Sequence, residues 1–159
     1  MIRSTLIGHV HLNVRDLARA EAFYTGILGF RVTERVEDKF VFLTLSGRHH
    51  DLALRNVGPE APVPGELAVG MYHFAIEVED MDSLAEVCRR LKEAGHPVGG
   101  SDHGVSLALY FRDPEGIEVE VYVDTRAEGG AGLGADRLGG APRPLDIEAL
   151  LARPGGKAE

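Results

Sequence analysis

Cysteine is almost missing from this 159-residue chain, in which Cys88 is the single example. One thiol cannot form an intramolecular disulfide, so a disulfide-bonded secreted domain is not expected. Cys88 lies in a stretch where apolar residues such as Leu84 and Leu91 recur at helical spacing, which favours a buried thiol. We therefore expect the protein to reside in a reducing compartment, the cytoplasm.

The chain also has few basic residues and no long hydrophobic runs. The 17 Lys and Arg residues against 25 Asp and Glu give a formal net charge of -8, which argues against a nucleic-acid partner because phosphates are bound mainly by Lys and Arg. No segment reaches the roughly 18 apolar residues that span a bilayer, and the N-terminal MIRSTLIGHV has no signal-peptide core. We expect a soluble, unexported protein without a membrane partner.

What is present is an ordinary globular composition, with 44% hydrophobic and 26% charged residues. The length suits one domain with a tail and is too short for two independent domains of ordinary size. Disordered and fibrous classes are therefore not indicated.

An internal repeat organises the chain. The string HVHLNVRDL, from His9 to Leu17, matches HFAIEVEDM, from His73 to Met81, at an offset of 64 residues. Each copy alternates like a strand and then reaches an aspartate, Asp16 or Asp80, that is suited to cap the start of a helix. The chain therefore contains the same strand and helix start twice.

Each predicted helix ends at a glycine, Gly29 or Gly95, and three short strand-like runs follow it. These runs are RVTERVE, FVFLTLS and HDLALRN in the first copy and HPVGGS, VSLALYFRD and IEVEVYVD in the second. Each copy is therefore predicted to be a βαβββ module, and the fold class is α+β. Two copies are too few for a solenoid, so we expect the modules to pack together.

The predicted domain is residues 1–124, with modules at 7–57 and 71–124. A connector from Gly58 to Gly70, with three prolines, joins the modules. Residues 125–159 are Gly-rich and are predicted to be a flexible tail with a possible short helix over IEALLA.

Two histidines and one glutamate lie on predicted strands of the modules. His9 and His73 open the first strand of each copy, and Glu120 lies in the last strand of the second. Two imidazoles and a carboxylate form the facial triad of non-haem Fe(II) sites, so these residues are predicted to bind a metal. An isolated strand histidine is more often simply hydrogen-bonded. The repeat, and the polar face that His9 shares with His11 and Asn13, favour the metal.

Residues from about Ile7 to Asp124 resemble the vicinal oxygen chelate superfamily. The resemblance is carried by the His-x-x-Leu-x-Val-x-Asp-Leu pattern at His9, by FYTGILGF at Phe23 and by DPEGIEVE at Asp113. It implies tandem βαβββ modules that form a cupped mixed β-sheet around a metal site. Glyoxalases, epimerases, fosfomycin-inactivating transferases, bleomycin-binding proteins and extradiol dioxygenases share this pattern, so it does not define one activity.

The strings RHHDLAL and DHGVSLALYFRDPEG are most similar to those of extradiol dioxygenases, the type I catechol 2,3-cleaving family. This resemblance implies that His50 is an acid/base group near bound oxygen, that His103 helps to orient the catechol ring and that Tyr110 hydrogen-bonds a substrate oxygen. It also selects Glu120 as the metal ligand over Glu118, which shares its strand face.

These residues also have simpler interpretations. His50 and its neighbour His49 could form a solvated turn, and His103 could be an exposed loop residue. Tyr110 lies where a strand favours aromatic residues in any case. The turn that begins at Asp113 is interpreted as structural. The combination of all three site residues favours the catalytic interpretation.

The resulting hypothesis is a meta-cleaving extradiol dioxygenase that uses Fe(II), with Mn(II) possible, on a catechol-type aromatic and O2. Glyoxalase-type relatives complete their metal shell with a carboxylate from the first module, and at the later offset of 66 the counterpart of Glu120 is Leu54, which offers no ligand. The alternatives are a metal-dependent lyase, isomerase or thiol transferase on the same fold, and a metal-free protein that binds aromatic drugs. The resemblance also implies a homodimer or larger homo-oligomer.

Overall fold

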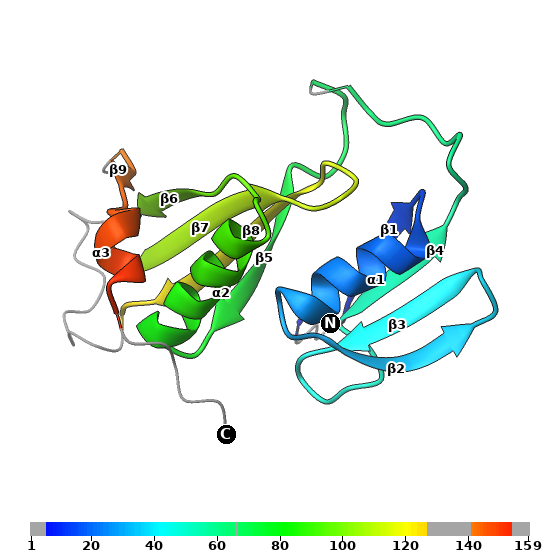
Figure 1. Cartoon of the computed structure of the whole chain (residues 1–159), viewed down its shortest axis with the longest axis horizontal. Helices are drawn as coiled ribbons and strands as arrows, with labels where there is room; N and C mark the ends of the chain where they lie inside the picture. Colours follow the sequence, from blue (N-terminus) through cyan, green and yellow to red (C-terminus); the bar gives the residue numbers. More distant parts are fainter. Residues whose placement is uncertain (1–5, 66, 127–140, 154–159) are drawn as a thin grey trace, which may run out of the picture. The chain divides into compact units, whose positions relative to one another are not determined.

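The chain divides into two compact units, unit 1 (Met1–Ala68) and unit 2 (Val69–Glu159). The computed structural model describes residues 6–65, 67–126 and 141–153 (Figure 1). The division falls inside the segment that we predicted as the connector. No helix in these described ranges combines the length and hydropathy needed to cross a bilayer.

Unit 1 is a four-stranded sheet with one helix, and its strand order is β1-β4-β3-β2. Strands β1 and β4 are parallel, whereas the other neighbours are antiparallel, so the sheet is mixed. The elements are β1 (Val10–Val14), α1 (Leu17–Gly26), β2 (Arg31–Val36), β3 (Phe40–Thr44) and β4 (Leu52–Asn56).

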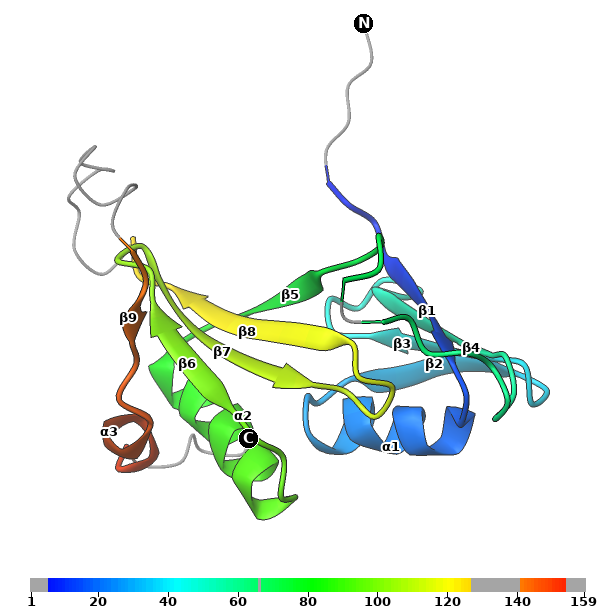
Figure 2. The ribbon, with the colours of Figure 1, turned by 90° about the horizontal axis from the view of Figure 1, so that it is seen from above.

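Unit 2 repeats this plan, with strand order β5-β8-β7-β6 and a fifth strand, β9, beyond β6. Strands β5 and β8 are parallel like their counterparts β1 and β4. In Figure 2, α2 lies along one face of this sheet and α3 lies near the β6 edge. The elements are β5 (His73–Val78), α2 (Met81–Glu93), β6 (Gly99–Asp102), β7 (Ser106–Arg112), β8 (Glu118–Asp124), β9 (Arg143–Pro144) and α3 (Ile147–Leu151). The α+β class and the two βαβββ modules are thus confirmed.

The two long helices begin and end by the same local devices. The Asp16 side chain accepts a hydrogen bond from Arg19 N at 3.0 Å, and the Asp80 side chain accepts one from Ser83 N at 2.7 Å. Beyond the helices, Gly29 (φ 74°) and Gly95 (φ 76°) occupy the left-handed region that favours glycine. The predicted helix boundaries are therefore confirmed to within a few residues.

Each sheet has one apolar and one polar face because its strands alternate. On β8, Val119, Val121 and Val123 are buried, whereas Glu120 and Tyr122 between them are partly exposed. The apolar face packs against α2, which contributes the fully buried Cys88. Burial raises the pKa of the Cys88 thiol, as expected for a structural cysteine. The polar faces remain available for chemistry.

The structure describes only part of the predicted C-terminal tail. Residues 127–140 and 154–159, on which 20 of the 35 tail residues fall, lie outside the described residues. The possible short helix is present as α3, and Asp146 caps it by accepting a hydrogen bond from Ala149 N at 3.0 Å.

Candidate metal centre

Unit 2 brings an imidazole and a carboxylate together on its polar face. His73 begins β5, and Glu120 lies on the neighbouring strand β8, opposite Ala75. The His73 Nε2 atom is 3.1 Å from Glu120 Oε2. On the other side of the ring, His73 Nδ1 is buried without a hydrogen-bond partner, and the nearest carboxylate oxygen, Glu118 Oε1, is 3.7 Å away.

This arrangement fits part of an Fe(II) or Mn(II) site, because both metals accept imidazole nitrogen and carboxylate oxygen. The ring nitrogen that is not used for the metal usually donates to a carboxylate, and Glu118 is the group near His73 Nδ1. Glu118 also lies 3.8 Å from Arg112 Nη2. The two glutamates that alternation could not separate thus have different neighbours.

Tyr110 and His103 extend this cluster through hydrogen bonds. Tyr110 lies directly opposite Glu120 on β7, and its hydroxyl donates to Glu120 Oε1 at 2.9 Å. His103 Nε2 is 2.9 Å from the same hydroxyl oxygen. Because the hydroxyl hydrogen points to Glu120, His103 Nε2 must carry the proton that it donates to Tyr110. Burial and the bond to Glu120 raise the pKa of the Tyr110 phenol, which is therefore protonated at neutral pH.

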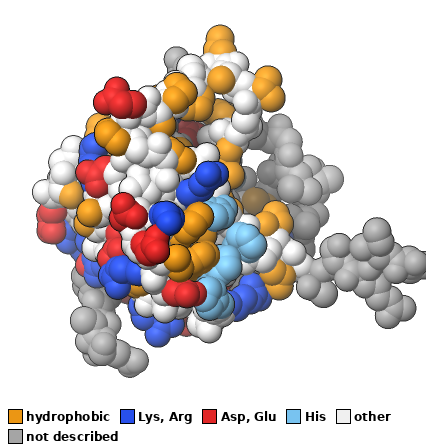
Figure 3. Space-filling view, turned by 90° about the vertical axis from the view of Figure 1, so that its right-hand side faces the viewer, with side chains coloured by type: hydrophobic (Ala, Val, Ile, Leu, Met, Phe, Trp, Pro, Cys, Tyr) orange, Lys and Arg blue, Asp and Glu red, His pale blue; other side chains and the backbone are white. Residues whose placement is uncertain are grey.

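Unit 1 gathers histidine and aromatic rings on its polar face. His9 lies just before β1 and contacts His50, just before β4, with ring centroids 4.4 Å apart. The His50 ring also contacts Phe42 at 5.1 Å. Figure 3 shows histidine side chains in one patch beside hydrophobic side chains. The strand that His9 was expected to open begins one residue later, where Val10 pairs with β4.

His50 is connected through His49 to Glu34, a contact that the sequence did not predict. His49 Nδ1 is 2.8 Å from His50 Nδ1, and His49 Nε2 is 3.0 Å from Glu34 Oε2. Burial lowers the pKa of His50, and repulsion from His9 and the other histidines lowers it further. The HH pair was visible in the sequence, but Glu34 is on β2, fifteen positions away, and nothing local connects it to His49.

The counterpart of Glu120 in unit 1 requires a correction. Glu120 pairs with Ala75, the second residue after His73, and the equivalent second residue after His9 is His11, which pairs with Ala53. The counterpart is therefore Ala53, one position before Leu54, whose side chain is in the core with 0% exposure. The prediction of Leu54 was wrong, because the offset between the modules is not constant along the chain: it is 68 from Phe42 to Tyr110 and 67 from Ala53 to Glu120, instead of 66. Ala53 also offers no metal ligand.

His9 belongs to unit 1, whereas His73 and Glu120 belong to unit 2. In the described residues, no group of three or more His, Cys, Asp and Glu side chains is gathered closely enough to hold a metal. The two-histidine, one-carboxylate set therefore remains a prediction.

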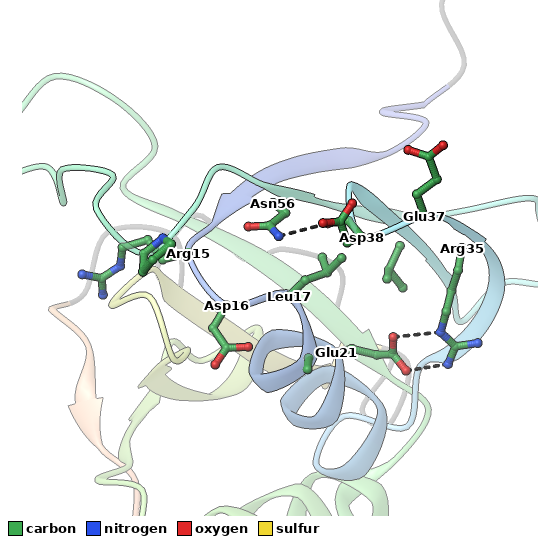
Figure 4. Close-up of a pocket in the computed structure, with 11 residues that line it drawn as sticks. Arg15, Asp16, Leu17, Glu21, Arg35, Glu37, Asp38 and Asn56 are labelled. Atoms are coloured by element: carbon green, nitrogen blue, oxygen red, sulfur yellow. Dashed lines mark hydrogen bonds and ion pairs between the residues drawn. The ribbon is translucent and has the colours of Figure 1, made fainter.

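Each unit has a cavity in its described part. In unit 1, a cavity of about 550 Å³ contains none of the predicted site residues and is lined mainly by charged side chains, including the Glu21–Arg35 ion pair (Figure 4). In unit 2, a cavity of about 530 Å³ is lined by Tyr110, Glu118 and their neighbours Pro97, Val98, Gly99, Phe111 and Arg112. Only the second adjoins the candidate centre.

Residues 6–121 match the model of the Glyoxalase/Bleomycin resistance protein/Dioxygenase superfamily. The chain belongs to this superfamily. A crystal structure of a glyoxylase/bleomycin resistance protein/dioxygenase domain from Frankia sp. EAN1pec has a TM-score of 0.68 and 28% identity, covering 77% of this chain and 99% of that one. The resemblance inferred from the motifs is therefore confirmed.

Similar proteins of known activity include two dioxygenases and one lyase. Catechol-2,3-dioxygenase of Bacillus subtilis is 38% identical over 120 residues, which are 76% of this chain and 42% of that protein. Biphenyl-2,3-diol 1,2-dioxygenase 3 of Rhodococcus globerulus is 30% identical over 125 residues, 76% of this chain and 64% of the relative. Lactoylglutathione lyase of Salmonella typhimurium is 30% identical over 145 residues, 79% of this chain and 96% of the lyase. The chain thus spans less than two thirds of both dioxygenases.

Proposed function

We propose that this protein is an extradiol ring-cleavage dioxygenase that opens a catechol-type ring with O2. The observation that carries the proposal is the hydrogen-bonded series His103, Tyr110 and Glu120, with His73 beside Glu120. In this series, a carboxylate that can bind a metal is hydrogen-bonded to Tyr110, and Tyr110 is hydrogen-bonded to His103. The phenol and the imidazole can both form hydrogen bonds with the oxygens of a diol. The similarity to two dioxygenases that act on aromatic diols supports the same activity.

In this proposal, His9, His73 and Glu120 hold one Fe(II), with Mn(II) as the alternative metal. When bound, the metal supplies a Lewis-acidic, redox-active centre with open positions where catechol and O2 are brought together. Glu118 orients the His73 ring through Nδ1. His11 lies on the same strand face as His9 but is not a ligand.

The remaining polar groups handle the substrate and its protons. The Tyr110 hydroxyl is protonated at neutral pH, so it can donate a hydrogen bond to a catechol oxygen, and His103 fixes the direction of that hydroxyl. His50 is neutral at pH 7 because its pKa is lowered, so it can accept a proton from the diol and return it later. In the overall reaction both oxygen atoms of O2 enter the product, and no external reductant is required.

The lyase activity of one relative is the main competing function. The resemblance implies that glyoxalase-type sites use a further carboxylate from the first module, and this chain has Ala53 at the counterpart of Glu120. With only three protein ligands, a bound metal would keep room for two catechol oxygens and O2. The alanine therefore favours ring cleavage.

The test is anaerobic reconstitution with Fe(II), addition of catechol or 2,3-dihydroxybiphenyl, and admission of air. We expect a yellow ring-opened product, which is a semialdehyde in the case of catechol, and consumption of one O2 per product. The same preparation is assayed for lactoylglutathione formation from the hemithioacetal. Lyase activity without chromophore from any diol would overturn the proposal, and light scattering of the same sample tests the expected homo-oligomer.

A further inference from the structure

The segment from Ala141 to Arg153 adds a layer to unit 2 beyond its βαβββ module. Strand β9 pairs antiparallel with β6, with Ser101 opposite Pro144 and Asp102 opposite Arg143. The pairing continues through a hydrogen bond from Leu145 N to Gly100 O at 3.1 Å. The superfamily match ends at residue 121, so this layer lies outside the shared core.

The layer is fitted closely to β6 at Gly100. A Cβ atom at this position would lie 2.9 Å from Ile147 Cδ1, the end of a flexible side chain, and 3.0 Å from Leu145 Cβ, which is tighter than nine in ten real contacts. At the neighbouring Gly99, a Cβ atom would meet nothing within 4 Å. A side chain at Gly100 would therefore force Leu145 and Ile147 of the C-terminal segment to shift.

Two further contacts fix the segment to α2. Leu150 of α3 is only 3% exposed, and α3 packs on α2. At the end of the segment, Arg153 Nε donates to Asp82 Oδ1 at 2.9 Å, and Arg89 Nη2 donates to Arg153 O at 3.3 Å. The segment thus bridges the first and third turns of α2 and the outer edge of β6.

Strand β6 leads directly into the residue that contacts Tyr110. It ends at Asp102, whose side chain accepts a hydrogen bond from Gly104 N at 2.7 Å. Between them, His103 N donates to Ser106 O at 2.9 Å, and the His103 ring reaches Tyr110. Without β9, the four-residue β6 would pair only with β7, and its two adjacent glycines would favour local opening.

We propose that residues 141–153 are a positioning segment that holds β6 in place so that His103 stays hydrogen-bonded to Tyr110. The consequence for turnover rests on the proposed dioxygenase function, but the positioning itself does not. The segment touches neither substrate nor metal ligands in this proposal. It acts through β6 and the first residue beyond it.

The test compares Gly100→Val with Gly99→Val in the full chain. Both changes put a β-branched residue into the same strand, so their effect on strand propensity is matched, and only the change at Gly100 collides with the segment. We expect faster amide hydrogen exchange over residues 99–105 in Gly100→Val. Exchange in β5 and β8 should be unchanged, and exchange over residues 99–105 in Gly99→Val should be no faster than in the wild type.

A second pair of variants displaces the segment without changing β6. Leu150→Asp places a charge at the buried contact with α2, whereas Ala149→Asp changes an exposed neighbour on the same helix. We expect Leu150→Asp to reproduce the exchange pattern of Gly100→Val. This pair keeps the proposal testable if Gly100→Val does not fold.

The decisive measurement is the His103 Nε2 proton in 15N-edited NMR spectra, since a merely structural segment would leave this proton unchanged. We expect its protected signal to be lost in Gly100→Val and Leu150→Asp and kept in both controls. A retained signal in both test variants would overturn the proposal, whatever the exchange rates show.

Turnover separates this inference from the proposed function. In an active wild type, Gly100→Val should lower kcat about ten- to a hundredfold at unchanged iron content, as expected for a misaligned substrate contact. Loss of the His103 signal in a protein that cleaves no diol would refute the dioxygenase function and leave the positioning role intact.

Discussion

The two units share one backbone plan and differ in the chemistry on their polar faces. The same two positions, facing each other across an antiparallel strand pair, hold Tyr110 and Glu120 in unit 2 and Phe42 and Ala53 in unit 1. Unit 2 therefore presents a carboxylate and a phenol, whereas unit 1 presents an aromatic ring and a methyl group. The comparison teaches that the repeated module fixes positions for side chains but not their function.

The electrostatic environments of the two faces differ accordingly. In unit 1, His50 lies among other histidines and its pKa is lowered, which favours a neutral base. In unit 2, burial and the hydrogen bond to Glu120 raise the pKa of the Tyr110 phenol, so this group stays a hydrogen-bond donor. The polar face of unit 1 therefore favours a neutral imidazole, and that of unit 2 a protonated phenol.

The largest expected effect tests which residues are ligands. His9→Ala, His73→Ala and Glu120→Ala should each lose iron and activity, because removing a ligand costs more than the roughly ten- to hundredfold loss typical of outer-shell changes. His11→Ala is the matched control on the same strand face as His9 and should keep its iron. Iron content after dialysis is the measurement. Iron loss in His11→Ala would show that the wrong histidine was chosen.

The next effect concerns the histidine cluster of unit 1. His50→Gln should bind iron and catechol normally but turn over about a hundred- to ten-thousandfold more slowly, since a general acid or base is lost. Single-turnover kinetics with saturating catechol measure this step directly. A rate close to that of the wild type would remove His50 from proton transfer.

A paired exchange sharpens the comparison between the units. Tyr110→Phe removes a hydrogen bond to a charged group, worth about 1.5–3 kcal/mol or roughly ten- to a hundredfold in turnover. Phe42→Tyr makes the equivalent position of unit 1 resemble Tyr110 and should change turnover by less than about twofold. Steady-state kcat and KM for one diol are sufficient. Equal effects of the two changes would mean that the units do not divide the chemistry as proposed.

The smallest effect is on stability and comes from the loop before β4. Burial alone would raise the pKa of Asp51, but hydrogen bonds from Ser46, Leu45 N and Thr44 hold that pKa at about 2. Because the folded pKa lies below the usual value of 3.8, the stabilisation is present above about pH 4 and is lost as the pH falls toward 2. Asp51→Asn should therefore reduce the free energy of unfolding at pH 7 by about 1 kcal/mol, allowing for solvent screening.

Urea unfolding at pH 7 and at pH 3 measures this difference, which should shrink at the lower pH. Asp38→Asn, in the exposed turn between β2 and β3, is the control and should have no comparable effect. A difference for Asp51→Asn that is independent of pH would mean that packing, and not the charge, explains the loss.

Much of the fold was predictable because its signals are local. The caps at Asp16 and Asp80, the glycines after the helices and the alternation of β8 each depend on residues close together in the chain. Tyr110 and Glu120 are ten residues apart in a hairpin, so their direct pairing also follows from a short stretch.

Other features depended on contacts between distant segments. Ala53, and not Leu54, is the counterpart of Glu120, because loops can change length without altering the register of the strands around them. The approach of Glu34 to His49 joins β2 to the loop before β4 and has no sequence signature. The packing of residues 141–153 against β6 could likewise not be predicted, because a glycine such as Gly100 does not indicate which residues pack on it.

By itself, the sequence determined the repeated βαβββ module, its superfamily and the residue types available for a metal, because these depend on local periodicity and on motifs. Only the tertiary structure decided which residue faces which across the sheets, how Glu118 and Glu120 differ in their neighbours, and what holds β6. The physical reason is that strand register, side-chain hydrogen bonds and edge packing are fixed by atoms far apart in the chain, where spacing along the sequence carries no information about distance.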